Sequence, residues 1–597
     1  MSFLTYNRGN CCHCLQSLSK LIIFIALISL SNGDRIKQKI YKPIESNYFC
    51  FRRLNATHQI GCQSKEGGNV GAVYVINNET DMDHVLNTGR HYPYIPVITP
   101  KDFNLETLKR FKSSDRITGV LVLDIKGDER KALKIEGLSP DKTCPNDGFG
   151  LYTGDKTHDH CGQQEWNLAE GLTERHNDGL MFNDWPFPIF LIKNETNIAQ
   201  IRDCFKRFGG PNYPLCGVQL EAPMNAAKDS VSCVRRTALQ RSSYSLSQTF
   251  FCDPLGGHNI FSTLLYTSKT DKIADNSVIV LAARLDSFSM FDNVSPGADS
   301  ALTSLVTLLA VAKTLNEYRN DLQQKANNRN VLYALFDGEA FDYIGSSRTV
   351  YDMNNDRFPV DPNSEKDLAQ LKTKHISHFI ELNQLATHGN DAMLYIHKNL
   401  KSNVKTKQLV DKLIQYGTQV TEIEDNRPLP PASLQVFLKD SQEIGGVVIA
   451  NHKKEYTNKY YNSLYDDSVN VNINDTKLAQ RLTTIATAVS KTIYELITQE
   501  TTKDITVNQT FVESLINCYM NNSVCDLFKY VSEPTAQRLN DYMDPLPTYV
   551  GVFGSSTMSS ISRAYTMLLL SRYTGEEHSD KTKDECTDLN KKSMVCY

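Results

Sequence analysis

The stretch LAARLDSFSMFDNVSPGADSALTS (281–304) decides the fold, because it joins a strand to a helix. The strand begins a little earlier, and NSVIVLAARLD (276–286) has the β-branched and apolar composition of a buried strand. The helix is predicted over ADSALTSLVTLLAVAKTLNEY (298–318) from its length and its content of alanine and leucine. A strand that leads into a helix is the unit from which parallel sheets are built.

Similar units follow along the chain. Strands are predicted in RNVLYALFDGE (329–339), HFIELNQLA (378–386) and GGVVIA (445–450), with helices between them and a long helix at about 475–498. Strands that alternate with helices indicate a mostly parallel sheet covered by helices on both faces. Sites in such sheets gather at the carboxyl ends of the strands, which here read RLDS, FDGE and ELNQ.

A smaller α/β lobe is predicted ahead of this large lobe. Short apolar runs such as VGAVYVI (70–76) and TGVLVLDI (118–125) alternate with polar and helical stretches up to about residue 200. A glycine-rich polar run at about 144–166 predicts a long, disulfide-closed loop of the kind that often acts as a lid. The predicted domains are a signal peptide at 1–33, a small lobe with this loop at 40–225, and a large lobe with a charged C-terminal tail at 226–597.

Composition and the N-terminus restrict the class of protein. Hydrophobic residues make up 40% and charged residues 22% of the 597 residues, as in ordinary globular proteins. The formal net charge of -4 gives no basic excess that would point to nucleic acid. The apolar run LIIFIALISL (21–30) follows Arg8 and Lys20 and predicts a secretory signal peptide. A signal anchor and a buried strand remain as alternatives.

The number and spacing of the cysteines agree with export of the protein into the secretory pathway. Three of the 15 cysteines precede the apolar run, and the other twelve form six close sequential pairs. Sequence does not fix connectivity, but neighbour pairing is the simplest hypothesis, and the tight repeats of structural zinc sites are lacking. The pairs are Cys50 with Cys62, Cys144 with Cys161, Cys204 with Cys216, Cys233 with Cys252, Cys518 with Cys525, and Cys586 with Cys596.

Seven sequons for N-glycosylation point the same way. A single N-x-[ST] match means little, whereas seven behind a signal peptide predict a sugared lumenal or extracellular domain in the secretory pathway. The acceptors are Asn55, Asn78, Asn194, Asn293, Asn474, Asn508 and Asn521.

The strand ends carry a resemblance to a known fold. RLDS, PGADSALTS, FDGEAFDYIGS, ELNQLA and YYNSLYDD, in that order, resemble the zinc aminopeptidase fold shared with transferrin receptor. Within that superfamily, FDYIGSSRTVYDM (341–353) resembles the nicastrin family, the glycosylated ectodomain subunits of γ-secretase. The resemblance runs from about residue 45 to beyond 570. It implies an α/β fold with a zinc-aminopeptidase-like large lobe, whose mostly parallel sheet is covered by helices, and a smaller α/β lobe.

The resemblance also locates the metal positions. A two-zinc peptidase of this type uses His, Asp, Glu, Asp and His, and alignment puts other residues at all five places. Arginine has no lone pair to donate and alanine has no donor atom, while serine, neutral asparagine and tyrosine are poor zinc ligands. We therefore expect no metal, no cofactor and no catalytic residue. The five lost ligand positions are Arg284, Ser300, Ala340, Asn383 and Tyr461.

A metal elsewhere is not expected. HISHFIEL (375–382) offers His375, His378 and Glu381, but residues three apart in a strand point to opposite faces.

One polar group of the peptidase site remains. Glu339 aligns with the general base, and we expect Asp342 and Tyr343 beside it on the helix that follows. With Arg284 they form the predicted substrate-binding set. The resemblance implies that this pocket receives the free amino terminus of a substrate, or that the whole domain gates substrates by bulk. Pairing of Glu339 with Arg284 inside the fold is a third possibility, and all three stay open.

The resemblance implies a non-catalytic subunit of the γ-secretase intramembrane protease, supporting the processing of type I membrane proteins such as Notch and the amyloid precursor. Implied partners are presenilin, the other membrane subunits and the ectodomain stubs of substrates. Two alternatives remain, an active secreted or lumenal metallo-exopeptidase and a soluble receptor-like binding module. The family is implied to be single-pass type I membrane proteins, yet the late apolar run MLLL (567–570) is far shorter than the roughly 20 residues of a span. We expect the transmembrane helix to be absent from this chain.

Overall fold

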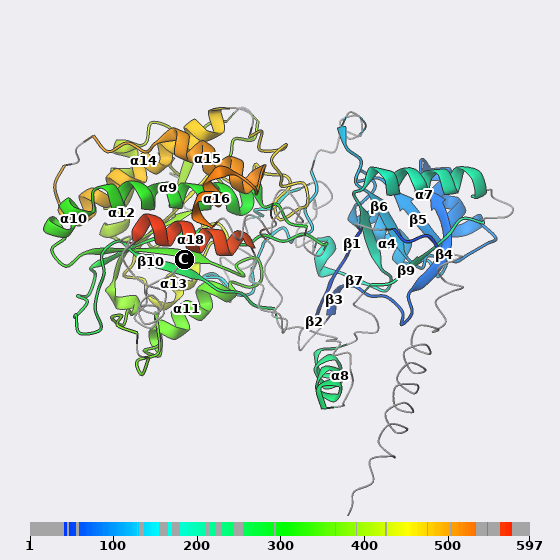
Figure 1. Ribbon diagram of the computed structural model, residues 1–597, viewed down its shortest axis with the longest axis horizontal. Coiled ribbons are helices and arrows are strands. Elements are labelled where there is room, and N and C mark those ends of the chain that lie inside the picture. The colour runs from blue at the N-terminus through cyan, green and yellow to red at the C-terminus, as the bar shows by residue number, and fades with distance from the viewer. Residues whose placement is uncertain are drawn as a thin grey trace, which may run out of the picture.

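Two sheets, each with its own helices, form the two lobes of the chain (Figure 1). The computed structural model describes residues 41–44, 47–54, 59–127, 129, 137–154, 165–169, 179–209, 215–222, 229–242, 255–291, 294–364, 366–389, 391–423, 427–473, 476–501, 504–532, 546, 548 and 561–575. The predicted signal peptide at 1–33 and most of the predicted C-terminal tail lie outside these residues.

The first lobe is built on a six-stranded sheet with the order β1-β8-β6-β5-β4-β9. Its four central strands are parallel, and the two edge strands, β1 and β9, are antiparallel to their neighbours. The strands are β1 (Asn47–Phe49), β4 (Asn69–Val75), β5 (Tyr94–Ile98), β6 (Val120–Leu123), β8 (Ile189–Ile192) and β9 (Gly217–Leu220). Every residue of β5, β6 and β8 is buried, which explains their uninterrupted apolar composition.

Helices and a small second sheet complete the first lobe. The helices are α3 (Glu79–Asp83), η1 (His84–Thr88), α4 (Leu105–Lys112), η2 (Leu180–Phe182) and α7 (Glu195–Phe208). The second sheet has the order β2-β3-β7, with β2 (Arg52–Leu54), β3 (Gln59–Cys62) and β7 (Asp184–Trp185). Helix α8 (Ser230–Ser242) follows on the way to the second lobe.

The second lobe holds a seven-stranded sheet with the order β10-β12-β11-β13-β16-β14-β15. Strands β12, β11, β13 and β16 are parallel in the centre, while β10 and the pair β14 with β16 are antiparallel. The prediction of a mostly parallel sheet is thus confirmed. The strands are β10 (Ile260–Thr263), β11 (Val278–Arg284), β12 (Asn330–Phe336), β13 (Ile376–Leu382), β14 (Leu394–Lys398), β15 (Val420–Glu422) and β16 (Gly445–Ala450).

Helices cover both faces of this sheet (Figure 1). The burial of alternate residues of β11 confirms that both faces are covered. Ile279 and Leu281 pack in the core on one face, and Val278 and Val280 pack in the core on the other. The first core includes residues of α9 (Thr303–Glu317), α12 (Val404–Tyr416), α14 (Thr476–Thr498), α15 (Gln509–Met520), α16 (Asp526–Val531) and α18 (Ile561–Thr574). The second includes residues of α11 (Ile344–Asn354) and α13 (Leu434–Asp440). The remaining short helices are η3 (Ala298–Leu302), α10 (Arg319–Lys325) and η4 (Thr373–His375).

Helix α9, with the η3 turn before it, is the central helix of the second lobe. Among the described residues, Ala298–Glu317 is the one helix long and apolar enough to cross a membrane, yet 94% of that window is buried inside the protein. Twelve of the fifteen residues of α9 are buried. Its apolar composition is therefore that of a core helix.

Three of the predicted cysteine pairs are confirmed as disulfides, and they are Cys50–Cys62, Cys204–Cys216 and Cys518–Cys525. Cys144 is disulfide-bonded, but its predicted partner Cys161 lies outside the described residues. The predicted partner of Cys233, Cys252, lies outside them as well, as do Cys586 and Cys596. Of the sequon asparagines, Asn78, Asn194, Asn508 and Asn521 are described and exposed, whereas Asn55, Asn293 and Asn474 are not described.

Candidate functional site

The predicted site lies at the carboxyl ends of β11, β12 and β13, where a parallel sheet gathers its functional groups. A cavity of about 20 Å³ opens there, enough for about one water molecule. Six of the predicted site residues line it together with groups outside the predicted site. The predicted ones are Arg284, Ser300, Glu339, Tyr343, Asn383 and Tyr461, and the others include Asn146, Glu381 and Ser433.

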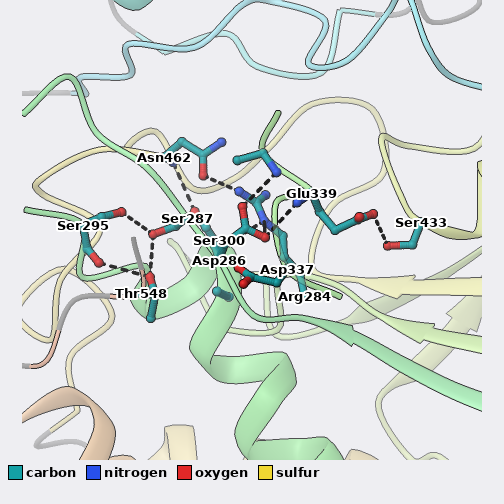
Figure 2. A network of polar contacts seen from close by, with 12 residues as sticks. Arg284, Asp286, Ser287, Ser295, Ser300, Asp337, Glu339, Ser433, Asn462 and Thr548 are labelled. Carbon is teal, nitrogen blue, oxygen red and sulfur yellow. Dashed lines mark hydrogen bonds and ion pairs between the residues drawn. The ribbon is translucent and has the colours of Figure 1, made fainter. Parts of the chain in front are cut away.

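Arg284, at the position that the resemblance assigns to the first metal ligand, donates to neutral groups and lies beside one carboxylate. Its guanidinium donates to the Tyr461 hydroxyl over 2.7 Å and to Asn462 Oδ1 over 2.8 Å. Its Nε donates to the carbonyl of Asp286 at 2.5 Å, and the Asp286 carboxylate lies 3.9 Å away. Figure 2 shows the guanidinium directed at Asn462, with Asp286 alongside. Two of the five lost ligand positions, Arg284 and Tyr461, are thus bonded to each other.

The other three positions are also engaged within the fold. The Ser300 hydroxyl accepts from the Asn462 peptide N–H at 3.2 Å. The peptide N–H of Ala340 donates to Asp286 Oδ2 at 3.0 Å. The Asn383 amide donates to a backbone carbonyl at 3.2 Å and accepts from the next peptide N–H at 2.8 Å. These residues do not fit a zinc pair, because none offers a carboxylate or an imidazole.

Glu339 is buried and fully hydrogen-bonded. Its Oε1 accepts from the peptide N–H of Ser346 at 2.7 Å, and its Oε2 accepts from the hydroxyls of Ser346 at 2.8 Å and Ser433 at 2.6 Å. Burial raises the pKa of Glu339 to about 7, against the opposing effect of these donors. The ion pairs of the described residues do not join Glu339 to Arg284, so the pairing of these two residues inside the fold is not formed.

Glu381, on β13, is a second buried carboxyl group in the same cavity. Its Oε1 accepts from the peptide N–H of Ser433 at 2.9 Å, and its Oε2 accepts from that of Leu434 at 2.7 Å. Burial raises the pKa of Glu381 to about 8. Sequence reasoning considered this residue only as a weak zinc candidate. Its position as the first residue of ELNQ, at the end of β13, was the available signal.

The prediction that Asp342 and Tyr343 lie on the following helix is wrong. Both have left-handed backbones, with φ of 60° and 54°, and α11 begins only at Ile344. The two residues form a tight turn that redirects the chain from β12 into the helix. The turn places the Tyr343 hydroxyl where it accepts from the peptide N–H of Ala432 at 3.1 Å, and it leaves Asp342 outside the cavity lining.

The lid-like loop lies against this turn. Asn146 donates from Nδ2 to the carbonyl of Glu339 at 2.7 Å and accepts at Oδ1 from the peptide N–H of Asp342 at 2.9 Å. Further along the loop, the peptide N–H of Leu151 donates to Gln435 at 3.0 Å. The described part of the loop is therefore fixed to the large lobe at the edge of the cavity.

A nearby segment of the first lobe supplies a buried acid that the sequence did not reveal. Asp141 Oδ2 accepts from the side chain of Asn462 at 2.9 Å, on the far side of the amide that holds Arg284. Burial raises the pKa of Asp141 to about 6. The Ser139 hydroxyl adds a bond to the carbonyl of Tyr461 at 2.7 Å. These contacts join positions more than 300 residues apart, which no local sequence pattern signals.

Fold and site together define the class of the protein: a two-lobed α/β protein in which the five positions that the resemblance aligns with zinc ligands hold residues without a carboxylate or an imidazole, two of them, Arg284 and Tyr461, bonded to each other. Within the part of the chain that the structure describes, no group of three or more His, Cys, Asp or Glu is placed to hold a metal ion.

Comparison with known proteins defines the family. The model of the nicastrin small lobe matches residues 49–226, and that of the nicastrin large lobe matches residues 277–494. The chain belongs to the nicastrin family.

Individual relatives support the assignment to the nicastrin family. Human nicastrin is 36% identical over 485 residues, which cover 77% of this chain and 64% of the human protein. Nicastrin of Dictyostelium purpureum is 28% identical over 606 residues, covering 97% and 85% of the two chains. A crystal structure of the gamma-secretase component nicastrin superposes with a TM-score of 0.70 at 28% identity, over 92% of this chain and 90% of that one. The match to human nicastrin thus spans less than two thirds of that protein's length.

Proposed function

We propose that this chain is a non-catalytic subunit of a γ-secretase complex, in which it gates or receives type I membrane substrates such as Notch and the amyloid precursor. Family membership supports the assignment to that complex. The observation that carries the non-catalytic part is Arg284, whose permanent positive charge stands in the first metal position, bonded to Tyr461 and Asn462. A cation fixed there repels a metal ion.

The partners in this proposal are presenilin, the other membrane subunits and the short ectodomain stubs of substrates. The location is the lumenal or extracellular side of the secretory pathway. The three disulfides of the described residues support it, since such bonds persist in oxidising compartments.

The size of the cavity favours gating over capture. About 20 Å³ accommodates one water-sized group, not an amino-terminal residue with its side chain. Asn146 also closes the turn beside Glu339. Gating by bulk needs only the surface of the two lobes, so it requires no change at the cavity.

The test of complex membership is co-purification. The chain, carrying a membrane anchor, is produced in cells that lack their own nicastrin and isolated through a tag. Presenilin should be recovered with it, and proteolysis of a short-stub substrate should be restored. Absence of presenilin from properly glycosylated, exported protein would contradict the proposal.

The gating mechanism is tested with matched substrates in the same cells. The substrates share a transmembrane segment and differ in the length of the ectodomain. Cleavage should become more efficient as the ectodomain becomes shorter, whether or not the amino terminus is acetylated. A loss of cleavage on acetylation of the short stub would instead support capture of an ammonium group.

The metallopeptidase alternative is tested on purified, dialysed protein. Elemental analysis should give well below one zinc per chain. Stoichiometric zinc together with chelator-sensitive release of amino-terminal residues would overturn the non-catalytic assignment.

A further inference from the structure

Two buried glutamates face one small cavity without a cation bound to either. Glu339 is 3% exposed and Glu381 is 4% exposed, and both line the cavity. Among the described residues, no ion pair joins either carboxylate to a lysine, arginine or histidine. Two like charges buried beside one cavity disfavour each other, which favours the uptake of a proton by one of the two groups.

The charged groups packed around the two glutamates do not neutralise them. Arg284 bonds to Tyr461 and Asn462. Asp286 accepts the peptide N–H groups of Glu339 and Ala340 and adds negative potential.

The next strand end gives the pair no counter-charge either. Asp337 is paired with Arg563 at 3.0 Å. The pKa of Tyr343 is raised well above its ordinary value by burial, so its hydroxyl stays neutral. The surroundings therefore reinforce the repulsion instead of relieving it.

The donors around Glu381 suit a carboxylate. Each of its oxygens accepts from a backbone N–H, that of Ser433 at 2.9 Å and that of Leu434 at 2.7 Å. A backbone N–H can only donate. A proton on either oxygen would weaken that oxygen as an acceptor and leave a buried donor poorly satisfied.

The donors around Glu339 suit a carboxylic acid. Its Oε1 accepts from one backbone N–H, but its Oε2 meets two hydroxyls, those of Ser346 and Ser433. A hydroxyl can reverse its role and accept. The Ser346 hydroxyl also has a second acceptor, the carbonyl of Tyr343 at 3.5 Å, to which it can turn.

Ser433 lies between the two acids. Its hydroxyl donates to Glu339 Oε2 at 2.6 Å (Figure 2), and its peptide N–H donates to Glu381 Oε1 at 2.9 Å. A protonated Glu339 can donate to Ser433 Oγ while the Ser433 hydroxyl donates to Glu381. All polar atoms of the trio are then satisfied with a single negative charge.

We infer that Glu339 and Glu381 share one proton, that this proton resides on Glu339, and that Ser433 relays its hydrogen bond to a charged Glu381. Glu339 is then a hydrogen-bond donor in the cavity, and Glu381 carries the negative charge. The inference concerns the isolated chain and does not depend on the proposed function.

Burial raises the pKa of both groups, to about 7 for Glu339 and about 8 for Glu381. The higher value for Glu381 taken alone would favour the proton there. We place the proton on Glu339 because the two peptide N–H groups at Glu381 cannot reverse, whereas the hydroxyls at Glu339 can.

The experiment compares amide variants of the purified chain near neutral pH. Gln at position 339 presents an N–H₂ to the two hydroxyls, as the protonated acid would. Gln at position 381 points an N–H₂ at a backbone N–H. The equilibrium constant for unfolding is measured by urea denaturation. For Glu339→Gln it should stay within about threefold of the value for the unaltered protein, and for Glu381→Gln it should be about tenfold higher or more. The reverse order would overturn the inference.

Infrared spectroscopy locates the proton directly. It tests the inference even if the Glu381→Gln protein cannot be produced in folded form. The unaltered protein should show the carbonyl stretch of a buried, protonated carboxylic acid, and Glu339→Gln should lack it. Ser433→Ala should shift that band, because it removes the acceptor of the proton, while Ser441→Ala, outside the cavity lining, should leave it in place. A band that persists in Glu339→Gln refutes the placement of the proton.

Discussion

The sequon asparagines allow the effect of the sugar to be separated from that of the side chain that carries it. Asn194 is the N-cap of α7, and its Oδ1 accepts from the peptide N–H of Asn197 at 3.1 Å. A glycan would be attached at Nδ2, so the cap and the sugar use different atoms of one amide. Asn194→Gln should remove both, whereas Thr196→Ala should destroy the sequon and keep the cap.

The expected difference follows from the cap. Loss of an Asn cap costs about 1 kcal/mol, and the exposed Thr196 contributes no contact of comparable worth. Asn194→Gln should therefore have a free energy of unfolding about 1 kcal/mol below that of Thr196→Ala, although both lack the sugar. The assay is urea denaturation of both variants and the parent, expressed in cells that glycosylate, with mass spectrometry to establish the loss of the glycan.

Two other sequon asparagines also cap helices, so the same comparison of variants can be repeated independently at each of them. Asn78 caps α3 with a bond to Asp81 at 3.0 Å, and Asn508 caps α15 with a bond to Phe511 at 3.1 Å. Caps so far apart should act additively, at about 3 kcal/mol for all three Asn→Gln changes. Equal stabilities for the Asn→Gln and Thr→Ala members of each pair would refute the reasoning.

Three further outcomes are expected. Arg563→Met should lower the free energy of unfolding by about 3 kcal/mol, measured by urea denaturation, because it leaves the buried Asp337 carboxylate unpaired; a loss below about 1 kcal/mol would contradict this. Burial raises the pKa of Asp141 to about 6, so its contribution to stability is full below its unfolded pKa of about 4 and is lost as pH rises through about 6. Asp141→Asn should flatten that part of the stability–pH curve, and an unchanged slope would exclude the assignment. Peptide mapping without reduction should recover Cys144 joined to Cys161, and a different partner would disprove neighbour pairing there.

The sheet of the large lobe was predictable because its strands carry their burial in their composition. Val278 to Ala283 are buried on both faces, and only an uninterrupted apolar run satisfies that position. The turn at Asp342 and Tyr343 was not predictable in the same way. Left-handed backbone usually requires glycine or asparagine, and here an aspartate and a tyrosine adopt it because bonds to Asn146 and Ala432 hold the turn.

The site itself was predictable only in part. The residues that occupy the former ligand positions were found through the resemblance of the motifs, and only Arg284, Ala340 and Asn383 among them lie at the end of a strand or just after one. Their partners could not, because Asp141 and Ser433 come from loops whose sequence carries no period. The charge of the cavity depends on these partners, so the sequence identified Glu339 but not the group that shares its proton.

Asn146 imitates a piece of backbone. Its side-chain amide donates to one main-chain carbonyl and accepts from one main-chain N–H, as a peptide group does when a strand joins a sheet. The first lobe thus completes the main-chain bonding of the second across a sequence separation of 193 residues. A fragment beginning at residue 255 would present that carbonyl and N–H to solvent, so the second lobe should need the first as an intramolecular folding partner to assemble its own strand end.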